Sequence, residues 1–212
     1  MITLADHETI AEISTGEYTE KHSRFIATLY PCGSEDEAAQ IIDEHKRKYW
    51  DARHNVYAYI LKDNTAKFSD DGEPHSTAGK PVYDCLLHSG LTDVLAIVTR
   101  YFGGILLGTG GLVRAYTAAT KAAIDSAARV YMRECAVFEI SIPYSEQGRV
   151  GTLLENVGAV IKDTYYSENV KLTFAVKAPD VDTFEEKLRE ISGDKLRAKK
   201  ISDEILPIIL KK

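Results

Sequence analysis

The sequence predicts an α+β protein that is organised as two domains, residues 1–134 and 135–212. Three observations lead to this prediction. Strand-like and helix-like segments alternate along the first 134 residues. A second run of segments, in the order βαββαβ, follows residue 135 and is typical of a ferredoxin-like sandwich. The length of 212 residues suits one large domain or two small ones and is sufficient to bury a core without disulfides or metals.

The elements of the first domain are identified from apolar spacing and from the residues that begin and end them. Ser34 starts a capping box, S-E-D-E, in which Glu37 occupies the third helical position, so a helix is expected next. Pro81 and Gly90 mark the beginning and end of a second helix. A third helix is expected over residues 112–130, and its many alanines predict close packing against a sheet. The expected strands cover residues 23–32, 55–61, 65–68 and 91–101.

The second domain shows its clearest pattern in residues 169–178. Val170, Leu172, Phe174 and Val176 alternate there with polar or small residues, as in an antiparallel strand with one buried face. Helices are expected over residues 145–156 and 180–191. The other expected strands cover residues 137–143, 158–166 and 199–210.

The composition excludes several classes of protein. Hydrophobic residues make up 44% of the chain and charged residues 27%, which excludes a disordered or collagen-like protein. The net charge of −6 leaves no uniformly basic surface, so nucleic-acid binding would need a local patch. No apolar run is long enough to cross a membrane, and the acidic N-terminus does not resemble a signal peptide. We therefore expect a cytoplasmic protein, with no membrane partner, in which Cys32, Cys85 and Cys135 are free, buried or half-buried thiols.

The most unusual stretch is RYFGGILLGTGGLVRAY, residues 100–116, which joins a strand to a helix. It contains Gly103, Gly104, Gly108, Gly110 and Gly111. Backbone N–H groups at a helix start attract anions, so these glycines form either a phosphate cradle, with Arg114 one turn into the helix, or a tight structural turn. Neither a Walker A motif nor a dinucleotide fingerprint is present.

Further expectations concern the backbone of two of these glycines and the side chains at the beginning of the stretch. We expect Gly104 and Gly110 to adopt positive φ, where a branched residue is strained. Arg100, Tyr101 and Phe102 at the strand end can stack on bases or bind a protein partner; alternatively, one of the two rings belongs to the core. Arg100 is expected to be accessible, because arginine is seldom fully buried.

A polar loop over residues 69–81 carries three acids, Asp70, Asp71 and Glu73. Clustered carboxylates can bind a divalent cation, but the loop lacks EF-hand spacing, and its Asp-Gly and Glu-Pro pairs favour a turn in which acids cap backbone donors. Lys80 can neutralise one acid, and Arg114 can pair with Asp70 or Asp71. We expect no obligatory metal and no cofactor.

Other polar residues give weaker signals. The six histidines form neither HxH nor HExxH, so a zinc site has no support; His54, at the start of a strand, is the best functional candidate among them. No local signature of a serine or cysteine nucleophile is present. A basic cluster near the chain end is either a solvated face or a phosphate-tracking patch. It consists of Lys195, Arg197, Lys199 and Lys200.

Five segments form a recognisable set. They are S-R-F at 23–25, D-A-R-H-N at 51–55, S-D-D-G-E-P at 69–74, T-A-G at 77–79 and the glycine-rich stretch at 100–116. This set resembles the IMPACT family, and in particular its bacterial, YigZ-like branch; the resemblance covers nearly the whole chain. One departure is His75-Ser76, where the family usually has Ser-Gly.

The resemblance implies a fold for each domain and a function in translation. The first domain would resemble the second domain of a small-subunit ribosomal protein, as in domain IV of elongation factor G. The second would be ferredoxin-like, as in domain V of that factor. The implied function is that of a non-enzymatic binding protein, associated with RNA, the ribosome or a translation factor, that regulates translation. In this hypothesis Arg100, Tyr101, Arg114 and Lys80 would contact the partner, and the five glycines of the 100–116 stretch would shape the surface. Two alternatives stay open: an enzyme of phosphate chemistry that uses the glycine-rich loop, and an adaptor that binds only proteins.

Overall fold

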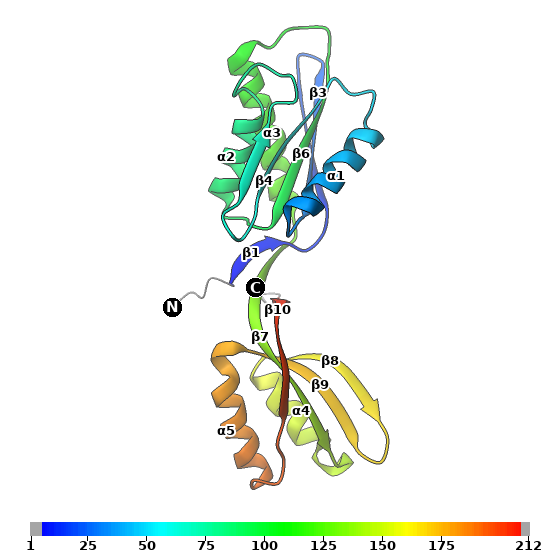
Figure 1. Cartoon of the computed structure of the whole chain (residues 1–212), viewed down its shortest axis with the longest axis vertical. Coiled ribbons are helices and arrows are strands. Elements are labelled where there is room, and N and C mark those ends of the chain that lie inside the picture. Colours follow the sequence, from blue (N-terminus) through cyan, green and yellow to red (C-terminus); the bar gives the residue numbers. More distant parts are fainter. Residues whose placement is uncertain (1–5, 209–212) are drawn as a thin grey trace. The chain divides into compact units, whose positions relative to one another are not determined.

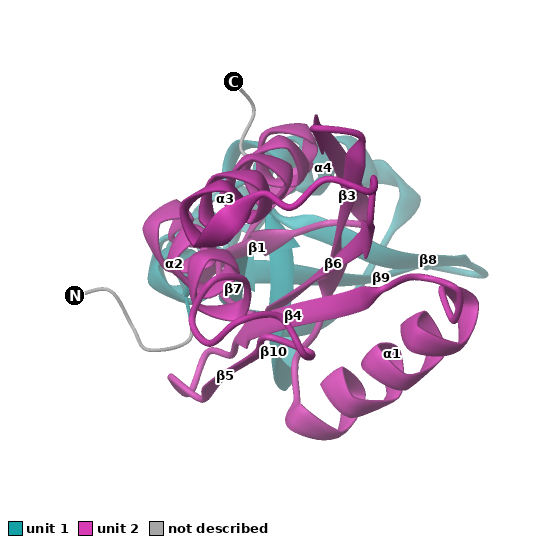
Figure 2. Ribbon diagram, turned by 90° about the horizontal axis from the view of Figure 1, so that it is seen from above, with its two compact units in different colours: residues 1–6, 132–208 teal, residues 7–131, 209–212 magenta. Residues whose placement is uncertain are grey.

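The structure, a computed structural model, describes residues 6–208 and divides into two compact units (Figures 1 and 2). Residues 7–131 form the N-terminal unit, and residue 6 together with residues 132–208 forms the C-terminal unit. The division falls inside strand β7, Arg129–Ile142. Each unit combines helices with a sheet of antiparallel strands, so the predicted α+β class is confirmed. Independent folding of the two halves stays a prediction.

Five strands form the sheet of the N-terminal unit, and each neighbouring pair is antiparallel. The order across the sheet is β2 (Ser14–Glu20), β3 (Ser23–Pro31), β6 (Val94–Tyr101), β4 (His54–Ile60) and β5 (Ala66–Ser69). The register pairs Tyr101 with Arg24 and Arg100 with His54. The beginnings of β3 and β4 and the end of β6 therefore meet at one end of the sheet, which we call the loop end.

Helices cover both faces of this sheet (Figures 1 and 2). Helix α1 (Glu35–Lys48) lies on one face, whereas α2 (Gly79–Ser89) and α3 (Gly108–Ser126) lie on the other. Ser34 caps α1 as predicted, since the Glu37 N–H donates to Ser34 Oγ at 3.2 Å. The second half of the predicted capping box differs, because the Glu37 carboxylate accepts from the N–H of Gly33, at 2.8 Å, and not from that of Ser34. Gly90 ends α2 in a left-handed conformation, with φ of 73°, as the sequence indicates.

Helix α3 approaches β2 more closely than side chains usually allow. A Cβ built on Gly16 would lie 2.2 Å from the backbone nitrogen of Ala123, so only glycine fits there. Ser14 Oγ also donates to the Ala123 carbonyl at 3.0 Å. The alanines of α3 make this contact possible, which confirms the expected close packing.

Two parts of the N-terminal unit differ from the expectations. Helix α3 begins at Gly108, four residues before the predicted start, and it ends at Ser126 because the following residues enter β7. Strands β1 (His7–Ile10) and β2 were not predicted. In β2 the side turned toward α3 carries Ser14 and Gly16 rather than branched apolar residues, so it lacks the usual strand pattern.

The C-terminal unit has the predicted βαββαβ order. After β7 come α4 (Gln147–Asn156), β8 (Val160–Tyr166), β9 (Val170–Lys177), α5 (Val181–Ser192) and β10 (Lys199–Ile208). Strands β7, β9 and β8 lie side by side in that order, and β10 also pairs with β7. Phe138, Phe174 and Phe184 pack together in the core, with ring centroids 5.3–5.9 Å apart. The last two positions of the predicted final strand lie outside the described residues.

The three cysteines are free and buried, as predicted, and burial raises the pKa of each thiol.

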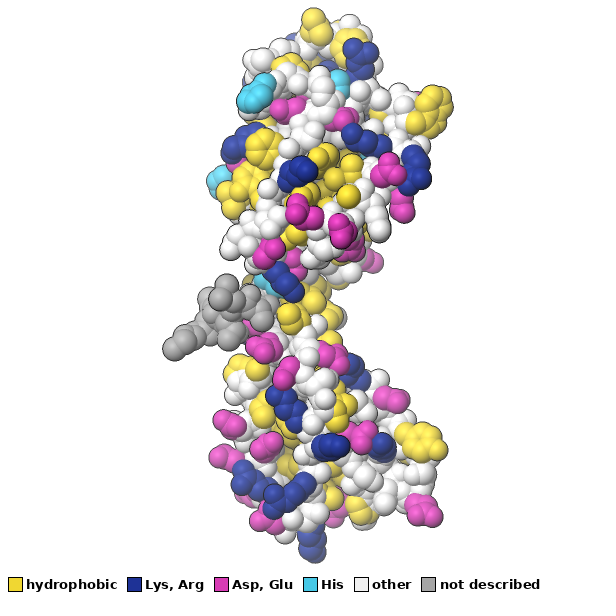
Figure 3. Space-filling model, in the orientation of Figure 1, with side chains coloured by type: hydrophobic (Ala, Val, Ile, Leu, Met, Phe, Trp, Pro, Cys, Tyr) yellow, Lys and Arg dark blue, Asp and Glu magenta, His cyan; other side chains and the backbone are white. Residues whose placement is uncertain are grey.

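The hydrophobicity and surface charge of the chain can also be compared with the sequence. Within residues 6–208, no helix has the length and hydrophobicity needed to cross a membrane. On the face drawn in Figure 3, basic and acidic side chains are interspersed in both units, and no uniformly basic surface is seen there.

A buried histidine connects α1 to the sheet. His45 is 3% exposed; the Tyr30 hydroxyl lies 2.8 Å from its Nδ1, and Thr99 Oγ1 lies 2.8 Å from its Nε2. Because the Thr99 hydroxyl donates to Asn55 Oδ1, it accepts from Nε2–H, and Nδ1 accepts from Tyr30. Both ring nitrogens are thus satisfied in the neutral state. Burial, with a smaller effect of Lys48, lowers the pKa of His45 to about 4.

This histidine predicts a pH dependence of stability. Between pH of about 4 and 6.5 the unfolded chain binds a proton at His45 that the folded chain does not, so the free energy of unfolding should rise with pH by up to about 1.4 kcal/mol per pH unit. Urea unfolding across this window should show that His45→Gln reduces the slope, whereas His88→Gln, at an exposed position, does not. An unchanged slope in His45→Gln would contradict the assignment.

Candidate functional site

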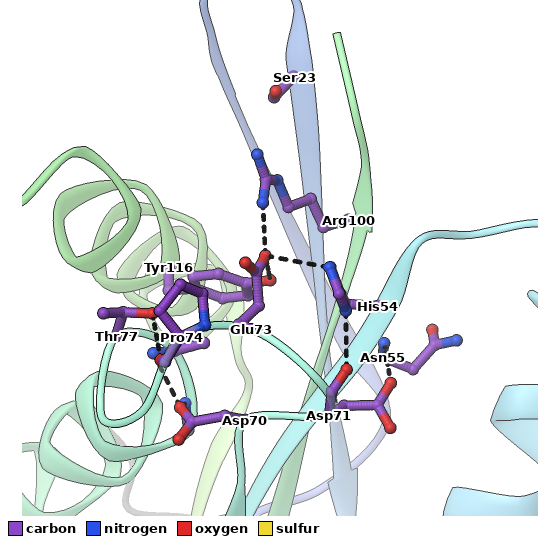
Figure 4. Close-up of polar contacts among 12 residues, drawn as sticks. Ser23, His54, Asn55, Asp70, Asp71, Glu73, Pro74, Thr77, Arg100 and Tyr116 are labelled. Carbon is purple, nitrogen blue, oxygen red and sulfur yellow. Dashed lines mark hydrogen bonds and ion pairs between the residues drawn. The ribbon is translucent and has the colours of Figure 1, made fainter. Parts of the chain in front are cut away.

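A buried carboxylate lies at the centre of the loop end of the N-terminal unit (Figure 4). The Glu73 side chain is 3% exposed. Its Oε1 accepts hydrogen bonds from Arg100 Nη1 at 2.6 Å and from the Tyr116 hydroxyl at 2.8 Å, and it lies 3.8 Å from His54 Nε2. The loop before α2 thus binds side chains from β6, α3 and β4. Burial, followed by the charge of Glu73, raises the pKa of Tyr116 well above its ordinary value.

Arg100 is buried, which contradicts the expectation that it is accessible. It is 5% exposed, and its Cζ lies 5.4 Å from the ring centre of Phe25 and 5.6 Å from that of Phe102. Within the described residues its Nε has no hydrogen-bond partner. Burial is possible because Glu73 supplies the opposite charge. The alternation of β6 carried a signal for this: Arg100 is in phase with Ala96 and Val98, which belong to the core beneath α2 and α3.

The other two acids of the loop have separate partners. Asp70 accepts from the backbone N–H groups of Ser76, Ala78 and Gly79 at 2.8–3.1 Å and so caps the start of α2. Asp71 pairs with Lys46 at 2.6 Å and accepts from a backbone N–H of β4 at 2.7 Å. The three carboxylates do not converge, and the described residues hold no cluster of three or more His, Cys, Asp or Glu suited to a metal. Asp70 therefore acts as the sequence predicted for an acid in a turn, by capping backbone N–H groups.

His54 is oriented by the same loop. Its Nδ1 lies 2.7 Å from the Asp71 carbonyl oxygen, which can only accept, so Nδ1 carries a proton. Nε2 is consequently directed toward Glu73 (Figure 4). The side chain is 14% exposed. Of the six histidines, the sequence singled out this one, and the structure places it beside the central carboxylate.

An open pocket of about 480 Å³ borders this polar group. We call it the loop-end pocket. Its apolar wall consists of Pro74, Phe102, Leu106, Leu107 and Leu112. Its polar lining consists of Arg53, His54, Glu73, Arg100 and Thr109, and Gly108 completes it.

The glycines of the β6–α3 loop have different roles. A Cβ on Gly103 would lie 2.1 Å from the carbonyl carbon of His22, so the two loops touch at backbone level. Gly104 and Gly108 have positive φ, of 84° and 71°. The expectation for Gly110 is wrong, because it lies within α3 without positive φ and has room for a Cβ. Gly111 is also helical, and a Cβ there would press on Leu107 at 2.9 Å.

Several predicted site residues lie outside the loop-end pocket. Tyr101 donates to Asp51 at 3.1 Å. Lys80 pairs with Asp84 on α2 rather than with a loop acid. Arg114 is exposed on α3 and, in the described part of the chain, has no acidic partner; the two acids suggested for it are bound elsewhere.

The basic cluster belongs to the C-terminal unit. All four of its side chains are exposed. Arg197 lies 3.6 Å from Asp194, and Lys200 lies 2.7 Å from Asp203. Half of the cluster is therefore locally neutralised, and Lys195 and Lys199 remain as its cations without a described acidic partner.

Comparison with known proteins assigns the family. Residues 21–124 match the Impact N-terminal domain, and residues 140–195 match a domain described as "Domain of unknown function (DUF1949)". The chain is 34% identical over 194 residues to "IMPACT family member YvyE" of Bacillus subtilis (strain 168), an alignment that covers 91% of this chain and 89% of the relative. The chain belongs to the IMPACT family.

Two further relatives support this membership. "IMPACT family member YigZ" of Escherichia coli (strain K12) is 34% identical over 181 residues, which cover 84% of this chain and 89% of that protein. A solved structure described as "Crystal structure of an hypothetical protein" is 31% identical, with a TM-score of 0.61 over 94% of this chain and 99% of its own. The IMPACT resemblance drawn from the five motifs is confirmed.

Sequence reasoning missed some residues of the loop-end pocket and the polar group beside it. Arg53, Tyr116 and Leu107 were not singled out, although each lies inside one of the five motifs or beside it. Tyr116 ends the glycine-rich stretch one helical turn after Leu112, and this helical spacing is the signal that places it on the inner face of α3. No pattern identifies Arg53 without knowledge of the pocket.

The two arginines of the motif should behave in opposite ways. Arg100→Ala leaves the Glu73 carboxylate buried without its cation and should lower the free energy of unfolding by about 3–5 kcal/mol. Arg114→Ala, at an exposed position, should change it by no more than about 0.5 kcal/mol. Urea denaturation measures both. Equal effects of the two variants would contradict a structural role for the buried ion pair.

The departure from the family pattern also predicts a change in stability. Ser76 has a φ of 61°, in the region that favours glycine, and the family usually has glycine there. Ser76→Gly should therefore raise the free energy of unfolding by up to about 1 kcal/mol. Ser145→Gly, in the short 3-10 helix before α4, is the matched control and should be destabilising. A loss of stability in Ser76→Gly would show that this backbone conformation is not strained.

Proposed function

We propose that this IMPACT-family protein is a non-enzymatic RNA-binding protein that acts on translation at the ribosome. The observation that carries the proposal is the surface of the loop end. Exposed Phe102 and Leu106 line a pocket there together with arginine, and exposed Trp50 lies in a neighbouring loop at the same end of the sheet. Trp50 and Leu106 are each 82% exposed, and Phe102 is 48% exposed. Such side chains in a folded unit favour a binding surface over a purely structural role.

The aromatic residues are suited to stacking on bases. Trp50 lies in the loop between α1 and β4, and Phe102 lies in the loop between β6 and α3. Because the start of β4 pairs with the end of β6, the two loops emerge at the same end of the sheet. Stacking on aromatic rings is tolerant of sequence and is the common way in which proteins bind unpaired RNA.

The cationic groups are suited to the phosphate backbone. Arg53 is exposed and lines the loop-end pocket, and in the described residues it has no carboxylate partner. Gly108 and Thr109, at the start of α3, line the same pocket, and the free N–H groups of a helix start favour an anion. With a net charge of −6, the protein would bind RNA through such a local site and not through its overall charge.

The finer fold supports a role in translation. The βαββαβ order, the neighbouring strands β7-β9-β8 and the pairing of β10 with β7 favour a ferredoxin-like C-terminal unit, as in domain V of elongation factor G. For the N-terminal unit we infer a fold like that of domain IV. These likenesses are analogies of fold, so the surface of the loop end remains the main support.

RNA binding is tested by fluorescence anisotropy with a single-stranded RNA of about twenty nucleotides, at salt concentrations from about 50 to 300 mM. Affinity should fall steeply with salt. Phe102→Ala and Arg53→Ala should each weaken binding by roughly tenfold, since a stacked base contributes about 1–3 kcal/mol. Phe68→Ala, on β5, is the matched control for the ring, because Phe68 is 42% exposed. Arg47→Ala, on α1, is the control for the charge.

The outcome separates this function from the alternatives. Retention of ribosomes or translation factors by the protein after nuclease treatment, with no direct RNA binding, would indicate a protein adaptor. Thermal stabilisation by a nucleoside triphosphate with Mg²⁺, together with its turnover, would indicate an enzyme of phosphate chemistry. Either result, or equal losses in the control variants, would contradict the proposal.

A further inference from the structure

We propose that the loop-end pocket binds a single unstacked nucleobase that carries an amino group, cytosine or adenine, as part of a nucleotide. The inference rests on the proposed RNA binding and adds a subsite to it. The inference starts from the contrast between the apolar wall of the pocket and its floor, by which we mean the buried polar side chains of Glu73 and Arg100. This contrast is typical of small-molecule sites, in which a few polar atoms fix orientation.

The size and wall of the pocket suit a flat aromatic group. A volume of about 480 Å³ lies within the range of ligand sites. Phe102 provides a ring, and Pro74 and Leu106 are exposed apolar side chains at the same pocket. A base that leaves the stack of an RNA strand would bury its faces against these residues.

The floor offers an acceptor that the fold leaves unused. Glu73 Oε1 accepts from Arg100 and from Tyr116, whereas Oε2 has no hydrogen-bond partner within the described residues. Glu73 lines the pocket despite being buried. A carboxylate oxygen in this position can accept from an exocyclic amino group, as carboxylates do with the N4 amino group of cytosine. Uracil presents a carbonyl oxygen at the same place, which the carboxylate would repel.

Arg100, which is hydrogen-bonded to the same carboxylate, supplies a donor. Arg100 lines the pocket and keeps an Nε–H that is buried without a partner. On their pairing edges, cytosine and adenine both carry an amino group next to a ring nitrogen that accepts a hydrogen bond. The amino group would donate to Glu73, and the ring nitrogen would accept from the Nε–H of Arg100. The Arg100–Glu73 pair balances its own charge, so the floor matches a neutral base better than a bare phosphate. The phosphate of the nucleotide would lie nearer the rim, where Arg53 and the start of α3 are found.

Binding of CMP, AMP, UMP and ribose 5-phosphate to the full chain, measured by calorimetry, tests the inference. CMP and AMP should bind about tenfold more tightly than UMP, and ribose 5-phosphate should bind most weakly. Thr109→Phe places a ring in the pocket from an exposed position at the start of α3 and should weaken CMP binding at least about tenfold. Val113→Phe, one turn further along α3 and outside this pocket, is the matched control and should bind CMP normally.

The carboxylate has a test of its own. Glu73→Gln replaces an acceptor by a group that can also donate, so it should abolish the preference for CMP over UMP while nucleotides still bind. If this variant does not fold, the comparison of CMP with UMP and the Thr109→Phe variant decide the matter. Equal binding of UMP and CMP to the wild-type chain would overturn the role of Glu73, and equal binding of ribose 5-phosphate would reveal a phosphate site instead.

Failure of this inference can be told apart from failure of the proposed function. If no nucleotide binds and Thr109→Phe leaves RNA affinity unchanged, the pocket is not a base site, although RNA binding stands. If CMP binds as described but RNA does not, the pocket is confirmed as a nucleotide site and the RNA-binding function is wrong.

Discussion

The buried ion pair between Glu73 and Arg100 is the interaction on which the loop end depends. It joins an irregular loop to the end of β6, and the Tyr116 hydroxyl adds α3 to the same carboxylate oxygen. Burying two charges costs free energy that their mutual attraction recovers only with good geometry and further hydrogen bonds. Here the cation also lies near the rings of Phe25 and Phe102. The pair therefore fixes three elements relative to one another at the pocket.

The acidic loop acts as an organiser through three different attachments. Asp70 holds the first N–H groups of α2, Asp71 connects the loop to α1 and β4, and Glu73 connects it to the core. The carbonyl of Asp71 orients His54 as well. Acids that look like a metal cluster in the sequence are in fact separated by their partners. The loop supplies both the support of the pocket and, through Glu73, part of its lining.

Much of the architecture follows from local patterns. The Ser34 capping box, the Gly90 helix end and the alternation of β9 gave helices and strands close to those observed. Strand β2 was not predicted from the sequence, because its inner positions, such as Gly16, are small and pack on the backbone of α3. The site was harder to predict. His54 and Glu73 were singled out, but their proximity depends on the register of β4 against β6 and on a loop conformation that no periodicity encodes. The alternation of buried residues in β6 indicated that Arg100 is buried. The prediction instead followed the general preference of arginine for the surface, and was therefore wrong.

The unpartnered Nε–H of Arg100 has a spectroscopic consequence. A guanidinium proton that is screened from water exchanges slowly, and one that lies near two aromatic rings resonates away from the arginines in solvent. This single proton is therefore an intrinsic label at the floor of the loop-end pocket, in a position where Arg53 and Arg114, both exposed, contribute no comparable signal. A molecule bound in the pocket beside Arg100 should shift this resonance, so the fold carries its own reporter of occupancy.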